Sequence, residues 1–110
     1  MKQGEIWYAN LNPVKGNEQA GFRPVVIISG DLLNQYLDIV ICCPLTSKVK
    51  RYKGNVVLHP NKMNQLKKKS EILTFHICSV SKHLLVKKTG SISPTEIDQI
   101  KACLDDILTY

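Results

Sequence analysis

The stretch Gly21-Phe22-Arg23-Pro24-Val25-Val26-Ile27-Ile28-Ser29 carries the strongest structural signal in the chain. Its consecutive β-branched residues, Val25 to Ile28, are followed by Ser29-Gly30, which predicts a strand buried on both faces. Pro24 has no backbone N–H, so we expect strand pairing to begin after it. The rest of the chain is interpreted around this strand.

Arg23 stands at the start of the predicted strand. Pro24 favours an extended backbone at the residue before it. A guanidinium fixed in this way can bind a phosphate or a carboxylate through paired hydrogen bonds. A strand-edge arginine in a surface ion pair is the alternative, and these residues alone leave both interpretations open.

Length and composition indicate one small globular domain, residues 1–110. The chain has 110 residues, 44% hydrophobic and 22% charged, which excludes wholesale disorder and allows a single modest core. Its apolar runs are too short for a membrane span. Polar residues follow Met1-Lys2 at once, so we expect no secretory signal, no membrane association and a cytoplasmic location.

The cysteine pattern favours free thiols. The chain has 4 cysteines, Cys42, Cys43, Cys78 and Cys103, without C-x-x-C spacing. Cys42 and Cys43 are adjacent, so on a strand they should point to opposite faces. We expect buried thiols in a reducing compartment rather than a zinc site or a disulfide framework, and no metal.

The net charge of +6 is unevenly distributed along the chain. The segment from Ser47 to Ser70 contains many lysines and no acidic residue, whereas acidic residues predominate after Pro94. A basic body suggests a polyanionic partner, most simply nucleic acid. The alternative is an ordinary solvated surface. The basic residues are Lys48, Lys50, Arg51, Lys53, Lys62, Lys67, Lys68 and Lys69.

Several short strands and one C-terminal helix are expected. Ser93, Pro94 and Glu96 form a capping-box pattern, and apolar residues then recur at helical spacing. These elements predict a fold that is mainly β with a C-terminal helix, in the form of a small barrel. Strands are predicted at Glu5–Ala9, Val25–Ile28, Asp38–Cys43, Asn55–Pro60, Glu71–Val80 and Val86–Ile92, a turn or helical turn at Asp31–Gln35, and helix packing at Ile97, Ile100, Leu104, Ile107 and Leu108.

The polar residues suited to chemistry lie near strand ends and in one long loop. The loop from Val14 to Phe22 carries Glu18 and Gln19, and its length is typical of functional loops. Thr46 and Ser47 follow the Asp38–Cys43 strand, where their hydroxyls could close a turn or bind a phosphate.

His76 and Cys78 are two residues apart on the predicted Glu71–Val80 strand and should share one face with Thr74 and Val80. An imidazole or a carboxylate can move a proton, while cations and hydroxyls hold a phosphate. The set Arg23, Glu18, Thr46, Ser47 and His76 therefore suits phosphodiester chemistry. RNA would supply its own 2′-hydroxyl nucleophile.

Two blocks of the sequence are similar to a known family. Gly4 to Ser29 (GEIWYANLNPVKGNEQAGFRPVVIIS) and Pro44-Leu45-Thr46-Ser47 resemble the MazF/PemK toxin endoribonucleases of toxin–antitoxin systems. The similarity continues more weakly through Ser70 to Leu85 and the final helix. It implies an SH3-like barrel of the PemK/CcdB type, a homodimer, and an RNA groove across the dimer interface.

The resemblance also implies a reaction. The family cleaves single-stranded RNA at short motifs without a metal or cofactor, leaving a 2′,3′-cyclic phosphate and a 5′-hydroxyl. Arg23 matches the catalytic arginine and Thr46 its partner at the phosphate, while Glu18 and Ser47 match positions near the RNA. An acidic antitoxin segment would occupy the same groove. Gln19, Phe22, Lys48, Lys50 and His76 complete the expected RNA-binding set.

The chain departs from the family pattern at two arginines. Relatives read Q-I-R-[ST] where this chain has His76-Ile77-Cys78-Ser79, and their later R-L is Leu84-Leu85 here. A non-enzymatic binder on the same fold, either gyrase-inhibitor-like or a decayed toxin that binds antitoxin, is therefore the alternative. A generic module for acidic peptides would explain the charge but not the pair Arg23 and Thr46.

Overall fold

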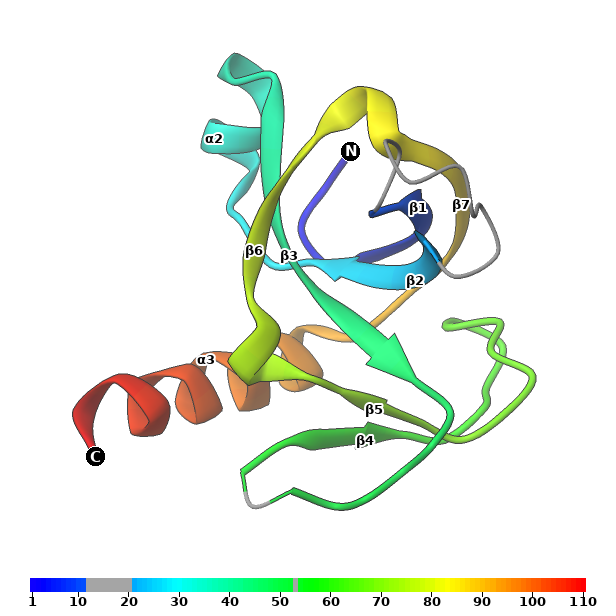
Figure 1. Ribbon diagram of the computed structural model, residues 1–110, viewed down its shortest axis with the longest axis vertical. Coiled ribbons are helices and arrows are strands. Elements are labelled where there is room, and N and C mark those ends of the chain that lie inside the picture. The colour runs from blue at the N-terminus through cyan, green and yellow to red at the C-terminus, as the bar shows by residue number, and fades with distance from the viewer. Residues whose placement is uncertain (12–20, 53) are drawn as a thin grey trace.

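The computed structural model describes residues 1–11, 21–52 and 54–110. Short strands alternate with helical turns, and the longest helix closes the chain (Figure 1). The elements are β1 (Glu5–Asn10), β2 (Phe22–Ile27), α2 (Asp31–Tyr36), β3 (Ile39–Thr46), β4 (Val56–Leu58), β5 (Ser70–Ile72), η1 (Thr74–His76), β6 (Cys78–Ser81), η2 (Lys82–Leu84), β7 (Leu85–Ser91) and α3 (Pro94–Thr109).

The strands form one antiparallel sheet. Its order is β4-β5-β3-β2-β1-β7, and β6 pairs with β3 off this path. β3 is the strand that connects the two parts of the sheet, since it pairs with β2, β5 and β6 (Figure 1). The prediction of a mainly β fold with a C-terminal helix is confirmed.

Side-chain alternation along β2 and β3 divides the interior into two cores. Val26 and Cys43 contribute to a core that includes Ile97 and Ile100 of α3. Val25 and Cys42 contribute to a second core on the other face, with Val80 of β6. Successive residues of a strand point to opposite faces, so the adjacent cysteines separate as predicted.

The strand limits at two prolines, Pro24 and Pro44, differ from those predicted. Pairing with β1 already begins at Phe22, opposite Asn10, although pairing with β3 begins at Val25. A proline removes a donor toward one neighbouring strand only, so Pro24 interrupts one ladder and not the other. The prediction that all pairing starts beyond Pro24 was wrong.

Pro44 does not end its strand either, because β3 continues to Thr46. β3 pairs with β6 as far as Cys42 and with β5 from Leu45. Pro44 lies at this change of partner, where the ladder is interrupted and a missing N–H costs little. Thr46 still lies at the strand end, as expected.

The single long strand predicted at Glu71–Val80 is absent. The structure has β5, then the helical turn η1, then β6 in its place. Thr74 is fully buried within η1, so it does not share a strand face with His76 and Cys78. The imperfect alternation of this segment reflects the break between two short strands.

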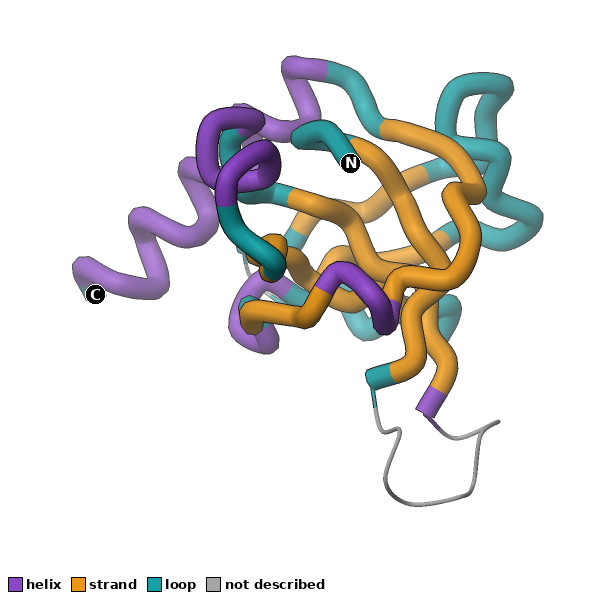
Figure 2. The backbone as a smooth tube through the Cα atoms, turned by 90° about the horizontal axis from the view of Figure 1, so that it is seen from above, coloured by secondary structure: helices purple, strands orange, loops and turns teal. Residues whose placement is uncertain are grey.

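The C-terminal helix begins as predicted and ends differently. Ser93 and Glu96 exchange both hydrogen bonds of a capping box. Ile97 and Ile100 are buried, but Leu108 is 84% exposed, so the expected packing of the last helical turns was wrong. The end of α3 projects beyond the sheet in both views (Figures 1 and 2). None of the helices described is long and apolar enough to cross a membrane.

The lysine-rich connection between β4 and β5 is fixed by Asn64 and Gly90. Asn64 is buried, and its side chain accepts from the Asn61 amide and donates to the His59 carbonyl. Gly90 of β7 lies against the Asn64 backbone, where an added Cβ would stand 2.2 Å from the Asn64 carbonyl oxygen. Glycine is required here for close approach of two backbones.

Replacing Gly90 by alanine should therefore destabilise the protein. Because the obstacle is backbone, we expect the Gly90→Ala variant to lose about 1–3 kcal/mol of unfolding free energy, measured by urea titration. Gly30→Ala is the matched control, since a Cβ there meets nothing within 4 Å. Equal losses in both variants would contradict the close-packing argument.

Candidate functional site

The site is built around Arg23, near the outer end of β2. Arg23 lies opposite Ala9 of β1, and its side chain is exposed. It occupies the same strand face as Val25 and Ile27, which fill the second core. No ion pair to its guanidinium occurs within residues 1–11, 21–52 and 54–110, so the surface ion-pair alternative has no partner there.

Arg23 and Thr46 share a hollow of about 290 Å³, which we call the Thr46 hollow. Val25 pairs with Pro44, and continuing this antiparallel register by two residues brings Arg23 opposite Thr46. Ser47 and Lys48 also line the hollow. A guanidinium, hydroxyls and an ammonium in one hollow form a donor-rich site for an anion.

The turn after β3 is held by the Thr46 hydroxyl itself. The Lys48 backbone N–H donates to Thr46 Oγ1 over 3.1 Å. This hydrogen bond is the turn-closing role that sequence reasoning had left open. It leaves the hydroxyl hydrogen of Thr46 available to donate, since an oxygen that accepts can still donate.

Arg23 also lines a second hollow, of about 440 Å³, which we call the His76 hollow. His76, Cys78 and Leu11 line it with Pro44. Arg23 is thus shared by both hollows, with hydroxyl groups on one side and an imidazole and a thiol on the other. His76 reaches this position from η1 rather than from the strand that the sequence predicted.

Glu71 fixes the basic turn beside the Thr46 hollow, and sequence reasoning missed it. Glu71 pairs with Thr46 across the β3–β5 ladder and is fully buried. Its carboxylate accepts from the backbone N–H groups of Lys50, Arg51 and Tyr52, at 2.8, 2.8 and 3.0 Å. One buried anion therefore orders consecutive residues of a cationic turn.

The pKa of Glu71 lies below its ordinary value near 4.5. Burial alone would raise this pKa, because it disfavours the charged form. The hydrogen bonds from Asn55 and from the three backbone amides lower it and outweigh burial. The carboxylate therefore remains ionised at neutral pH and contributes stability there.

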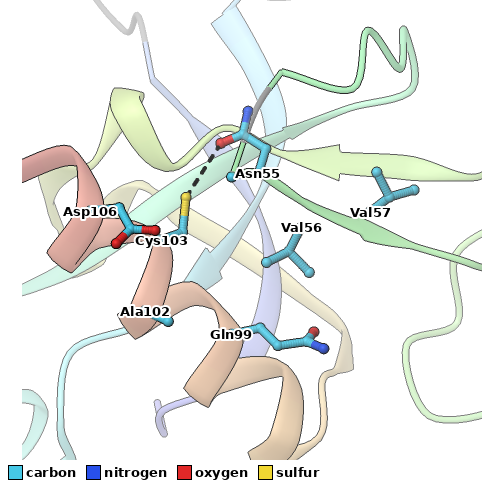
Figure 3. Close-up of a pocket in the computed structure, with 8 residues that line it drawn as sticks. Asn55, Val56, Val57, Gln99, Ala102, Cys103 and Asp106 are labelled. Atoms are coloured by element: carbon cyan, nitrogen blue, oxygen red, sulfur yellow. Dashed lines mark hydrogen bonds between the residues drawn. The ribbon is translucent and has the colours of Figure 1, made fainter. Parts of the chain in front are cut away.

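Asn55 connects this carboxylate to the C-terminal helix. Its side-chain N–H donates to Glu71 over 2.9 Å, and its oxygen accepts from Thr74 Oγ1 over 2.6 Å. Cys103 Sγ of α3 lies 3.9 Å from the same oxygen, as Figure 3 shows at the pocket between α3 and β4. That pocket contains none of the predicted site residues.

The remaining predicted site residues that the structure describes do not line the two hollows. Phe22 stacks on Tyr8, with ring centroids 5.6 Å apart, and lies on the opposite strand face from Arg23. Lys50 lies in the Glu71-bound turn and lines neither Arg23 hollow. Glu18 and Gln19 fall outside the described residues.

An exposed aromatic cluster continues from the His76 hollow. The rings of Phe75 and His76 lie 4.7 Å apart, and Tyr52 meets Phe75 edge to face at 5.3 Å. Phe75 and Tyr52 are 46% and 49% exposed. No local sequence pattern indicated that these residues meet, because they come from two separate turns.

Substituting glutamine for Glu71 tests the support of the basic turn. In the Glu71→Gln variant an amide nitrogen replaces one carboxylate oxygen, and this nitrogen cannot accept a hydrogen bond from a backbone N–H. The variant should therefore lose about 1–3 kcal/mol of unfolding free energy at pH 7. The folded-state pKa of Glu71 is lowered, so the stabilisation is complete above the unfolded pKa and declines as pH falls.

The difference in unfolding free energy between wild type and Glu71→Gln should therefore shrink below about pH 4.5, which urea titrations at several pH values would measure. Asp98→Asn, a change at an exposed carboxylate on α3, is the charge-matched control. A difference that stays constant with pH would contradict the role of the Glu71 charge.

The fold and the site define a small cationic β protein with a donor-rich hollow at a strand end. The family described as PemK-like, MazF-like toxin of type II toxin-antitoxin system matches residues 2–108. This chain belongs to that family. The match covers both hollows and the whole Glu71 network.

Individual relatives agree with this assignment. The chain is 34% identical over 107 residues to a protein of Staphylococcus saprophyticus named Endoribonuclease MazF, covering 96% of this chain and 88% of that one. A solved MazF structure from Deinococcus radiodurans has a TM-score of 0.80 at 23% identity, covering 100% of this chain and 97% of its own.

A mycobacterial endoribonuclease solved with its cognate antitoxin also has a TM-score of 0.80, at 20% identity, and covers 98% of this chain and 94% of its own. These structural similarities concern the fold alone, and they confirm the SH3-like, PemK-type architecture expected from the sequence. The sheet of this chain is open between β4 and β7, which is compatible with that fold.

Proposed function

We propose that this chain, an endoribonuclease toxin of the MazF class, cuts single-stranded RNA at Arg23 by metal-independent attack of the 2′-hydroxyl. The attacking oxygen bonds to the adjacent phosphorus and the 5′-oxygen leaves, giving 2′,3′-cyclic phosphate and 5′-hydroxyl ends. The observation that carries the proposal is the position of Arg23 between a hydroxyl-lined and an imidazole-lined hollow.

Arg23 stabilises the transition state in this proposal. Negative charge develops on the phosphoryl oxygens as the new bond forms, and a preorganised guanidinium stabilises it or protonates the leaving oxygen. Thr46 Oγ1 donates to a phosphoryl oxygen while it accepts from the Lys48 amide. Ser47 and Lys48 hold the phosphate from the same hollow.

In this proposal His76 exchanges a proton with the RNA, and the exposed aromatic rings bind its bases. An imidazole within the His76 hollow is placed to exchange a proton with the 2′-oxygen or the 5′-oxygen. Bases of single-stranded RNA stack on exposed aromatic side chains, and Phe75 and Tyr52 provide such faces beside this hollow. Glu18, Gln19 and Phe22 complete the proposed RNA-binding set.

The partners follow from charge and family. The excess of lysine between Ser47 and Ser70, of which Lys48 lines the Thr46 hollow, suits RNA, and it also suits an acidic antitoxin segment that competes for the same groove. A homodimer with the RNA groove across its interface, acting in the cytoplasm, completes the proposal. The mycobacterial relative solved in complex with its cognate antitoxin supports the antitoxin part of this proposal.

Removing the Arg23 guanidinium tests the proposal directly. Arg23→Ala should lower the single-turnover cleavage rate about 10³-fold, because charge stabilisation in the transition state is lost. Its unfolding free energy should change little, since the side chain is exposed. Arg51→Gln is the matched control, since it removes the other guanidinium from an exposed turn.

Cleavage by Arg23→Ala at the wild-type rate would overturn the assignment of the site. A wild type that binds RNA or antitoxin without cutting would instead identify a non-enzymatic member of the family.

The basic turn should bind RNA through its charge. In a cleavage-deficient Arg23→Ala background, adding Lys48→Gln and Lys50→Gln should reduce the slope of log affinity against log salt by roughly 1.4, given about 0.7 per phosphate contact on single strands. Affinity would be measured by fluorescence anisotropy with a labelled RNA. Lys87→Gln with Lys101→Gln is the charge-matched control, and an equal reduction there would show only a general charge effect.

A further inference from the structure

Cys78 and Cys42 form a cross-strand pair beside the proposed active site. They are directly opposite each other in the β3–β6 ladder, two residues along from the pair Val40 and Val80. Opposite residues of an antiparallel pair point to the same face, with Cα atoms about 4.5–5.5 Å apart, which lies within the range that a disulfide spans.

The two thiols differ in access. Cys42 is fully buried in the second core, whereas Cys78 is exposed and lines the His76 hollow with Arg23. Burial, and then the neighbouring thiols Cys78 and Cys43, raise the pKa of Cys42. Because only Cys78 of the two is exposed, an oxidant from solvent reacts with Cys78 first, and the buried Cys42 thiol lies opposite it in the ladder.

The other cysteines are placed differently. Cys43 belongs to the first core, on the opposite face of β3, and burial and then the Cys78 and Cys103 thiols raise its pKa to about 12. Cys103 is buried on α3 in contact with Thr74. Neither is the register partner of Cys78, so the geometry selects Cys42 as its reaction partner.

We propose that Cys78 and Cys42 are a modification site for hydroperoxides, closing to a disulfide at the wall of the His76 hollow. Cys78 sulfur attacks a peroxide oxygen, the O–O bond breaks, and an alcohol or water leaves with a proton, which gives a sulfenic acid. Cys42 sulfur then attacks Cys78 sulfur and displaces hydroxide, which takes up the Cys42 proton. Two thiols and one hydroperoxide give one disulfide, one alcohol or water, and one water.

The disulfide connects β6 to β3 at the residue where β6 begins. His76 lies two residues before Cys78, so the bond fixes the segment that brings the imidazole toward Arg23. It also keeps Cys78 from irreversible oxidation to sulfinic acid. This proposal rests on the thiol geometry and is independent of RNA cleavage.

The test is a thiol count on the full chain after treatment with hydrogen peroxide. Wild type should fall from 4 free thiols to 2 after denaturation and alkylation, with Cys42 and Cys78 peptides linked in a non-reducing digest and released by dithiothreitol. In Cys42→Ala, Cys78 should instead accumulate as a sulfenic acid that dimedone traps.

Cys43→Ala is the matched control, since it removes the adjacent buried thiol and should still form the Cys42–Cys78 bond. Far-UV circular dichroism checks that each variant folds. Dimedone trapping of Cys78 in the wild type without loss of the Cys42 thiol, or a linkage of Cys78 to Cys43, Cys103 or a second chain, would overturn the proposal.

Discussion

The antiparallel pairing of β2 with β3 is the constraint on which the site depends. Its register sets Val25 opposite Pro44, and strand alternation then places Arg23 and Thr46 on one face beyond the second core. The buried part of each strand fixes the direction of the exposed part. A one-residue slip of β2 against β3 would put Arg23 and Thr46 on opposite faces, so core packing and site geometry are specified by the same pairing.

The cationic turn after β3 lies beyond the β2–β3 pairing, and the buried Glu71 carboxylate fixes its shape. It neutralises the accumulation of positive charge and satisfies several backbone donors at once. Asn55 extends the same network to Thr74 and, through Cys103, to α3. The helix therefore supports the candidate site from the opposite side of the sheet, through Asn55 and Cys103.

Sequence patterns predicted the elements with strong local signals. The β-branched run of β2 and the capping box at Ser93 and Glu96 depend on neighbouring residues, and both were identified. The break of Glu71–Val80 into β5, η1 and β6 depends on contacts with β3, β4 and α3, which no local pattern contains. Glu71 was overlooked for the same reason: its role comes from a turn about twenty residues earlier in the chain.

In the proposed reaction the RNA 2′-hydroxyl is the nucleophile, and the chain supplies its electrostatic and hydrogen-bonding environment. The most direct measurement is the chemistry of the fragment ends after wild-type protein cuts a long single-stranded RNA in EDTA. The proposed reaction should give discrete fragments with 5′-hydroxyl ends that polynucleotide kinase labels without prior phosphatase treatment. Fragments with 5′-phosphate ends, or cleavage that EDTA prevents, would contradict it.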